Sequence, residues 1–309
     1  MLIQIASFGQ TEMQSITEQI QTHTYKVGQL STQISQDVGN SIPPHIEVIK
    51  LHMQKCIDFN REMPPTMHLA ALGSDNASYL SGIQRRSLLL VHLLYLGAVT
   101  LMHRRLLVYV AEGRLPGNQN VVITEEIKGY HDYCLLTAQQ AAGVAKVILD
   151  DGTLPKQCWV AVYQAFGSSS ILLFFIAQKL LHRNHDRLDD DFIYAEHCIQ
   201  LLEWCSTVET LAARYVGIVR PIFDGLKTLY IQGSVRTPGS PTPVREDVLP
   251  LAKQMNRILI DPYGVVQMAE MSPGHDLSAG FSHKAQSPTS LNWFANPAEP
   301  LLRARDMTG

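Results

Sequence analysis

The chain has 309 residues, of which 46% are hydrophobic and 17% are charged, and its formal net charge at pH 7 is -3. Soluble domains usually carry about 25% charged residues, so much of this chain is expected to lie in an interior. The small negative charge excludes a general attraction to nucleic-acid phosphates, and we expect no direct nucleic-acid binding by this chain.

Five cysteines occur without any C-x-x-C pair. This pattern fits neither a disulfide framework nor a cysteine-rich zinc site. We therefore expect buried free thiols in a reducing compartment, and hence an intracellular protein of the nucleus or the cytoplasm. The N-terminal MLIQIASFGQTEMQ lacks the basic and long apolar regions of a secretory signal, which agrees with that expectation.

The first predicted elements are three helices. Two amphipathic helices are expected over residues 18–34 and 44–60, the second bounded by prolines. A much longer helix is expected to begin between residues 75 and 80 and to end near residues 113–117. Strand signals are nearly absent along the whole chain, so the sequence predicts an all-α fold.

Four further helices are expected after residue 123. An N-cap hydroxyl and two carboxylates suit the start of the first, and three consecutive aspartates precede the third. Pro221 predicts a kink or a break in the last one. These helices cover residues 124–151, 159–181, 192–208 and 209–232.

The organisation expected from these elements is a multi-helix globular array in three parts. Residues 1–70 form N-terminal helices that pack on the core, and residues 71–232 form the core itself. Residues 233–309 read as a Pro/Gly/Ser-rich linker, 233–248, and a C-terminal tail beyond Pro262 in which Trp293-Phe294 is a candidate docking point.

Two segments approach the composition of a membrane span, residues 87–102 and 159–181. The first is interrupted by His92 and runs directly into a His-Arg-Arg triplet, and the second contains a glutamine and three consecutive serines. Such residues are costly in a bilayer, whereas helices buried in a large helical protein are apolar on most sides. We expect core helices and no membrane partner.

Four consecutive segments resemble those of a known family in their order and their pattern of apolar and polar residues. They are SLLLVHLLYLGAVTLMHRRLL, CLLTAQQAAGVAKVILD, CWVAVYQAFGSSSILLFFIAQKLL and AEHCIQLLEWCSTVETLAARYVGIVRPIFDGLKTLY. Met102-His103-Arg104 matches a Leu-His-Arg-Pro-like signature, with Arg105 where proline is common. Over residues 80–232 the chain resembles the later half of the middle homology region of fungal zinc-cluster transcription factors. Further matches are Ala138, Ala141, Ala142, Ala145, Ala212, Ala213, Arg214 and Tyr215.

The resemblance implies a helical regulatory domain. Regulatory members of the family also carry an N-terminal cluster of six cysteines that holds two zinc ions and places a basic helix on DNA. This sequence has no such cluster. We therefore expect a regulatory fold without its own DNA-binding module, and a complete natural chain rather than a trimmed fragment.

Aromatic and polar side chains align on two of the predicted helices. One stripe contains His92 and Tyr95, and the other contains Trp159, Tyr163 and Phe166. If the stripes face each other, they form an apolar wall with a few hydroxyl and imidazole groups, which is typical of small-molecule sites. The alternative is ordinary core packing, in which each polar tip is bonded to a neighbour. These five residues are the candidate ligand-binding residues, and no catalytic residue is predicted.

Two groups of residues have the side-chain types of metal ligands. The aspartates at 189–191 are consecutive rather than spaced as in magnesium-binding motifs, and the histidines at 182, 185 and 197 lie near a polar segment. The sequence has no Gly-rich phosphate loop and no nucleophile elbow. We expect no metal and no cofactor.

The sequence is compatible with two functions. The first is a regulatory domain that binds a hydrophobic small molecule or a protein partner, with a homodimer left open. The second is a cofactor-independent enzyme of fungal natural-product biosynthesis on the same fold, a pericyclase-like protein that guides cyclisation or isomerisation of a hydrophobic substrate.

Overall fold

The computed structural model describes residues 2–39, 45–72, 80–114, 125–152, 154–235 and 244–262. Every regular element within these ranges is helical, so the predicted all-α fold is confirmed. The elements are α1 (Leu2–Gly39), α2 (Ile46–Glu62), the 3-10 turn η1 (Pro65–Met67), α3 (Leu69–Leu72), α4 (Gly82–Arg114), α5 (Glu125–Asp151), α6 (Trp159–Leu181), α7 (Leu188–Ser206), α8 (Thr210–Val235) and α9 (Val244–Ile260).

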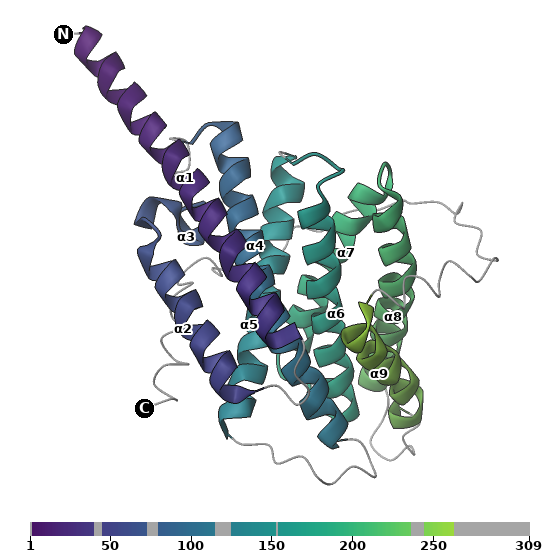
Figure 1. Cartoon of the computed structure of the whole chain (residues 1–309). Helices are drawn as coiled ribbons and strands as arrows, with labels where there is room; N and C mark the ends of the chain where they lie inside the picture. The colour runs from purple at the N-terminus through teal and green to yellow at the C-terminus, as the bar shows by residue number, and fades with distance from the viewer. Residues whose placement is uncertain are drawn as a thin grey trace.

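Helix α6 lies at the centre of the array (Figure 1). It packs against α4, α5, α7, α8 and α9, and seventeen of its 23 residues are buried. A helix covered on all sides has to be apolar around its whole circumference. This packing explains why the sequence of α6 resembles a membrane span.

Helix α4 is the second long apolar helix. Gly82–Arg104 and Trp159–Leu181 are both long and apolar enough to cross a membrane, but 67% and 83% of their most apolar windows are buried inside the array. At the start of α4, the Ser81 hydroxyl accepts a hydrogen bond from the backbone N–H of Gln84, and the Gln84 side chain accepts one from the backbone N–H of Ser81. This reciprocal capping fixes the first turn of the helix.

Helices α1 and α2 cover the side of α4 away from α6 (Figure 1). The helix α1 is longer than the predicted 18–34, and its N-terminal end projects beyond the other helices in Figure 1. The two outer helices are joined by the His52 Nε2 and Asp37 Oδ2 atoms, which are 2.8 Å apart. The N-terminal helices therefore pack on the core along α4.

Two predictions about the later helices are corrected by the structure. The predicted break at Pro221 does not occur, because α8 continues through this exposed proline, and the alternative of a kink stays a prediction. The predicted linker, 233–248, is too long at both ends, because its first residues belong to α8, which reaches Val235, and its last residues belong to α9, which begins at Val244. Helix α9 docks through a buried stripe that the linker prediction overlooked: Val248, Ala252, Met255 and Leu259. The predicted tail beyond Pro262, including Trp293-Phe294, lies outside the described residues.

Candidate functional site

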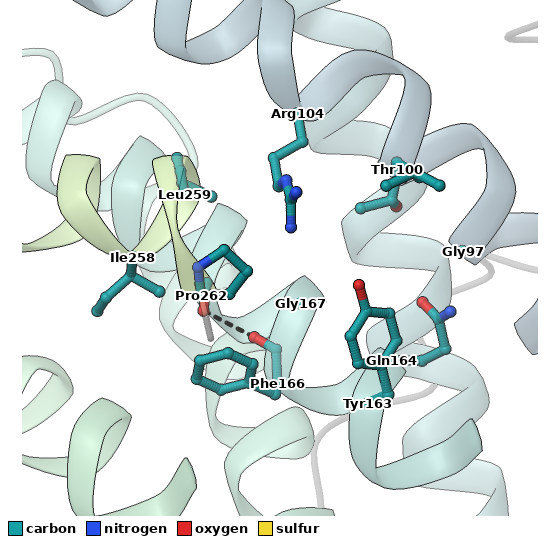
Figure 2. A pocket seen from close by; sticks show the side chains of 12 residues that line it. Gly97, Thr100, Arg104, Tyr163, Gln164, Phe166, Gly167, Ile258, Leu259 and Pro262 are labelled. Carbon is teal, nitrogen blue, oxygen red and sulfur yellow. Dashed lines mark hydrogen bonds between the residues drawn. The ribbon is translucent and has the colours of Figure 1, made fainter. Parts of the chain in front are cut away.

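A small pocket lies where α4, α6 and α9 meet (Figure 2). Helix α4 contributes Gly97, Thr100, Leu101 and Arg104, which share one face of the helix because they are spaced three and four residues apart. The open space in the pocket is about 30 Å³. That volume is enough for about two water molecules.

Two polar atoms from α4 border this space without a partner. The Nε of Arg104 and the Oγ1 of Thr100 are buried, and no described residue forms a hydrogen bond with either atom. In Figure 2 the Arg104 guanidinium points from α4 toward the space between Tyr163 and Pro262. A buried donor without a partner loses the free energy of hydration that it had in water. These two atoms therefore give the pocket hydrogen-bonding groups that no described residue uses.

A third polar group comes from α6. The Gln164 side chain is 8% exposed and lies against the backbone of Gly97. A Cβ atom at position 97 would lie 1.8 Å from Gln164 Nε2, so only glycine leaves room for this amide beside α4. The glycine thus allows a polar side chain to reach the border of the pocket.

The remaining walls are apolar. Phe166 of α6 stacks on Tyr215 of α8, with ring centroids 3.9 Å apart and an interplanar angle of 6°. Helix α9 closes the opposite side with Ile258 and Leu259, and Pro262 follows directly after it. The Ser170 hydroxyl is already used, because it donates to the Phe166 carbonyl at 2.8 Å. The pocket therefore combines apolar walls with a cluster of donors on one side.

The predicted residues His92 and Tyr95 lie on the other side of α4. The Nε2 of His92 donates to the Met67 carbonyl at 2.8 Å, and burial lowers the pKa of His92 to about 4. The Tyr95 hydroxyl points at the Cys56 carbonyl at 3.4 Å, and its ring stacks on Phe59. Burial also raises the pKa of Tyr95 well above its ordinary value.

His103 continues this face of α4 about two turns after Tyr95. Its Nδ1 donates to the Val99 carbonyl at 2.8 Å, and its ring lies beside Tyr130 and Tyr133. Burial lowers the pKa of His103 to about 4, so the ring is neutral near pH 7. The Nε2 of His103 is buried without a described partner, as are the atoms of Thr100 and Arg104, but none of the three residues on this face borders the pocket.

The other three predicted residues are divided between the pocket and the surface. Tyr163 and Phe166 border the pocket, whereas the Trp159 side chain is 71% exposed at the start of α6. The two predicted stripes therefore do not face each other as one wall. The ligand-binding role of all five residues stays a prediction.

Charged and thiol groups elsewhere are engaged in the packing of the helices. Asp191 is fully buried, and its carboxylate accepts hydrogen bonds from Lys179 Nζ at 2.5 Å and from Gln139 Nε2 at 2.8 Å. Four of the five cysteines are buried and all five are free, and burial raises the pKa of Cys56 to about 12. Within the described ranges, no cluster of three or more His, Cys, Asp or Glu side chains is suited to hold a metal ion.

No family model matches this chain, and no curated protein or solved structure is significantly similar to it. The properties of the site therefore rest on its own geometry.

Sequence reasoning missed the three polar groups that distinguish the pocket, which are those of Thr100, Arg104 and Gln164. A signal was present in the sequence, because Gly97, Thr100 and Arg104 share a helix face that is less apolar than the rest of α4. Their importance depends on the proximity of α6 and α9, which the spacing within α4 does not predict.

Proposed function

We propose that this chain is a regulatory, ligand-binding helical domain of the fungal transcription-factor type, acting without its own DNA-binding module, and that its effector binds in the α4–α6–α9 pocket. The observation that carries the proposal is the combination of apolar walls with buried, unpartnered donors in one recess. Small-molecule sites are usually lined in this way, with few polar groups that orient the ligand.

The position of α9 supports a regulatory role for the pocket. A ligand there would contact Ile258 and Leu259 of α9 as well as residues of α4 and α6. A ligand changes a conformational equilibrium only if it makes different contacts in the two states. Because the contacts to α9 exist only when α9 is docked, an effector would favour the docked state. A protein partner that contacts α9, where the Ile260 side chain is 52% exposed, would sense the change.

The size of the pocket favours this function over the cyclase. Sites for drug-sized ligands occupy about 300–1,000 Å³, whereas this space is about 30 Å³. In addition, His92 and Tyr95, which were the candidate donors for a cyclase, already face backbone carbonyls. We further propose an intracellular protein of the nucleus or the cytoplasm, away from membranes, because both span-like helices are largely covered by other helices.

The test combines retention of a ligand with a measurement of α9. The purified protein is incubated with hydrophobic and with polar metabolite extracts, and retained compounds and new products are identified by mass spectrometry. Hydrogen exchange is then compared between the free and the loaded protein. We expect a retained compound, no new product, and slower exchange in residues 251–260. A new product, or extracts that leave no compound bound and exchange in α9 unchanged, would contradict the proposal.

A further inference from the structure

We infer that the ligand of this pocket is a small monocarboxylate, whose anionic group is bound by Arg104 and whose short apolar part lies against α9. The inference rests on the proposed function, since it names the chemical class of the effector. It follows from the charge, the donors and the volume of the pocket.

Among the described residues, Arg104 gives the pocket a positive charge that no carboxylate balances. Arg104 is half-buried, its Nε has no partner, and no described carboxylate forms an ion pair with it. The other buried or half-buried cations on the neighbouring helices do have carboxylates: Lys179 binds Asp191, and Arg220 binds both Glu196 and Glu203. The Nε–H of this guanidinium is removed from water without a described acceptor, which is unfavourable, so the pocket favours an anion.

The neutral groups of the pocket also favour an acceptor. The Thr100 side chain is 7% exposed and its hydroxyl has no described partner. The Gln164 amide lines the same pocket but lies beside Gly97, two turns of α4 before Arg104 (Figure 2). A carboxylate is planar and accepts from several donors at once, and a guanidinium commonly binds it through two parallel hydrogen bonds. An amine or an alcohol would leave most of these donors unpaired.

The walls and the volume limit the rest of the ligand. Leu101, Phe166, Ile258 and Leu259 offer only apolar contacts to the part of the ligand beyond its anionic group. One guanidinium balances one negative charge, which favours a monocarboxylate over a doubly charged phosphate. Because the present space of about 30 Å³ is smaller than such a molecule, the side chains that line the pocket have to rearrange on binding while α9 stays docked.

The experiment uses matched acids and amides on the full chain. Isobutyrate, isovalerate and phenylacetate are each compared with the amide of the same carbon skeleton, and dissociation constants are measured by NMR titration that includes the Nε–H signal of Arg104. We expect each acid to bind at least tenfold more tightly than its amide and to shift the Arg104 signal.

Two arginine variants of α4 distinguish binding at the pocket from a non-specific effect of positive charge. Arg104→Met should weaken the binding of the acids at least tenfold and leave the amides unchanged, because it removes the charge and keeps an apolar chain of similar length. Arg86→Met, at an exposed position of the same helix, should change neither series. Thermal unfolding of both variants verifies that they fold, and Thr100→Val, an isosteric change, provides a second loss of affinity if Arg104→Met is unstable.

The outcomes distinguish the inference from the proposed function. If amides bind as tightly as acids, or if Arg104→Met leaves the affinity for acids unchanged, the inference is wrong while a ligand-binding pocket stands. If neither series binds at the pocket and no extract compound is retained, the inference and the proposed function are both wrong.

Discussion

Helix α4 carries polar side chains on two nearly opposite faces, and their surroundings differ. On the face toward α2 and η1, His92 and Tyr95 reach backbone carbonyls of residues far away in the sequence. On the face toward α6 and α9, Thr100 and Arg104 border a small space and have buried atoms without a described partner. The two faces are separated by roughly 130° around the helix axis.

This difference in hydrogen-bond partners helps to distinguish a polar group that stabilises the fold from one that can bind a ligand. A buried polar group that is bonded to a backbone carbonyl fixes one packing arrangement and is explained by the fold alone. A buried donor that borders open space has a cost that the fold does not offset. We therefore assign the first face to stability and the second face to binding.

The largest expected effect concerns the packed face. Tyr95→Ala should lower the free energy of unfolding by about 3–5 kcal/mol, because it removes a buried ring and its stacking on Phe59. The measurement is equilibrium unfolding in urea. The control Tyr95→Phe keeps the ring and loses only a hydroxyl 3.4 Å from its acceptor, so its cost should stay near or below about 1 kcal/mol. Equal losses in the two variants would show that the hydroxyl, rather than the packing, stabilises this face.

The next effect is a pH dependence that belongs to the packed face. The folded pKa values of His92 and His103 are lowered to about 4 from a model-peptide value near 6.5, so the unfolded chain takes up protons first as the pH falls. Their contribution, up to about 3 kcal/mol each, is present above about pH 6.5 and is lost as the pH falls toward 4.

This pH dependence is measured as the free energy of unfolding at about pH 7.5 and at about pH 5. His92→Gln, which keeps a donor for the Met67 carbonyl, should reduce the difference between the two values. Thr100→Val on the pocket face should leave the difference unchanged. A pH dependence that is the same in all three proteins would contradict the assignment of neutral histidines to the packed face.

The smallest expected effect compares two glycines that border the pocket. Gly167→Ala has open space for its Cβ and should stabilise the helix by about 0.5–1 kcal/mol. Gly97→Ala places its Cβ against the Gln164 amide, so this gain should be cancelled and Gln164 displaced. Thermal unfolding measures the first difference, and the side-chain amide signal of Gln164 in NMR measures the second. Equal stabilisation by both variants, with an unmoved Gln164, would show that Gly97 does not reserve this space.

Most of the fold was predictable because helices depend on local signals. Glycine at the end of α5 is one case: Gly152 has a φ of 57° and its N–H bonds to the Ile148 carbonyl, which ends the helix where the sequence predicts a break. The three aspartates are another, although they lie in the first turn of α7, which begins at Leu188, rather than before a helix that begins at residue 192. Helix α9 was missed because its apolar stripe is short and begins inside a proline-rich segment, where local composition indicates a linker.

The site was less predictable, because each side chain acquires its role from distant residues. Spacing alone placed Tyr163 and Phe166 on one face of α6, and both border the pocket. The same spacing grouped them with Trp159, which is exposed, because the start of α6 lies at the surface of the array. Periodicity determines which residues share a face, but it does not determine which neighbour covers that face.

The sequence by itself determined the helices, their order and the apolar character of α4 and α6, since these depend on residues close together in the chain. Only the tertiary structure decided the hydrogen-bond partners of two side chains. His92 donates to a carbonyl 25 residues away in the sequence, and Tyr95 donates to a carbonyl 39 residues away. The tertiary structure also decided that Arg104 meets a pocket formed with α6 and α9. The physical reason is that a buried polar group is satisfied by whatever the packing brings near it, and packing joins residues that are far apart in the sequence.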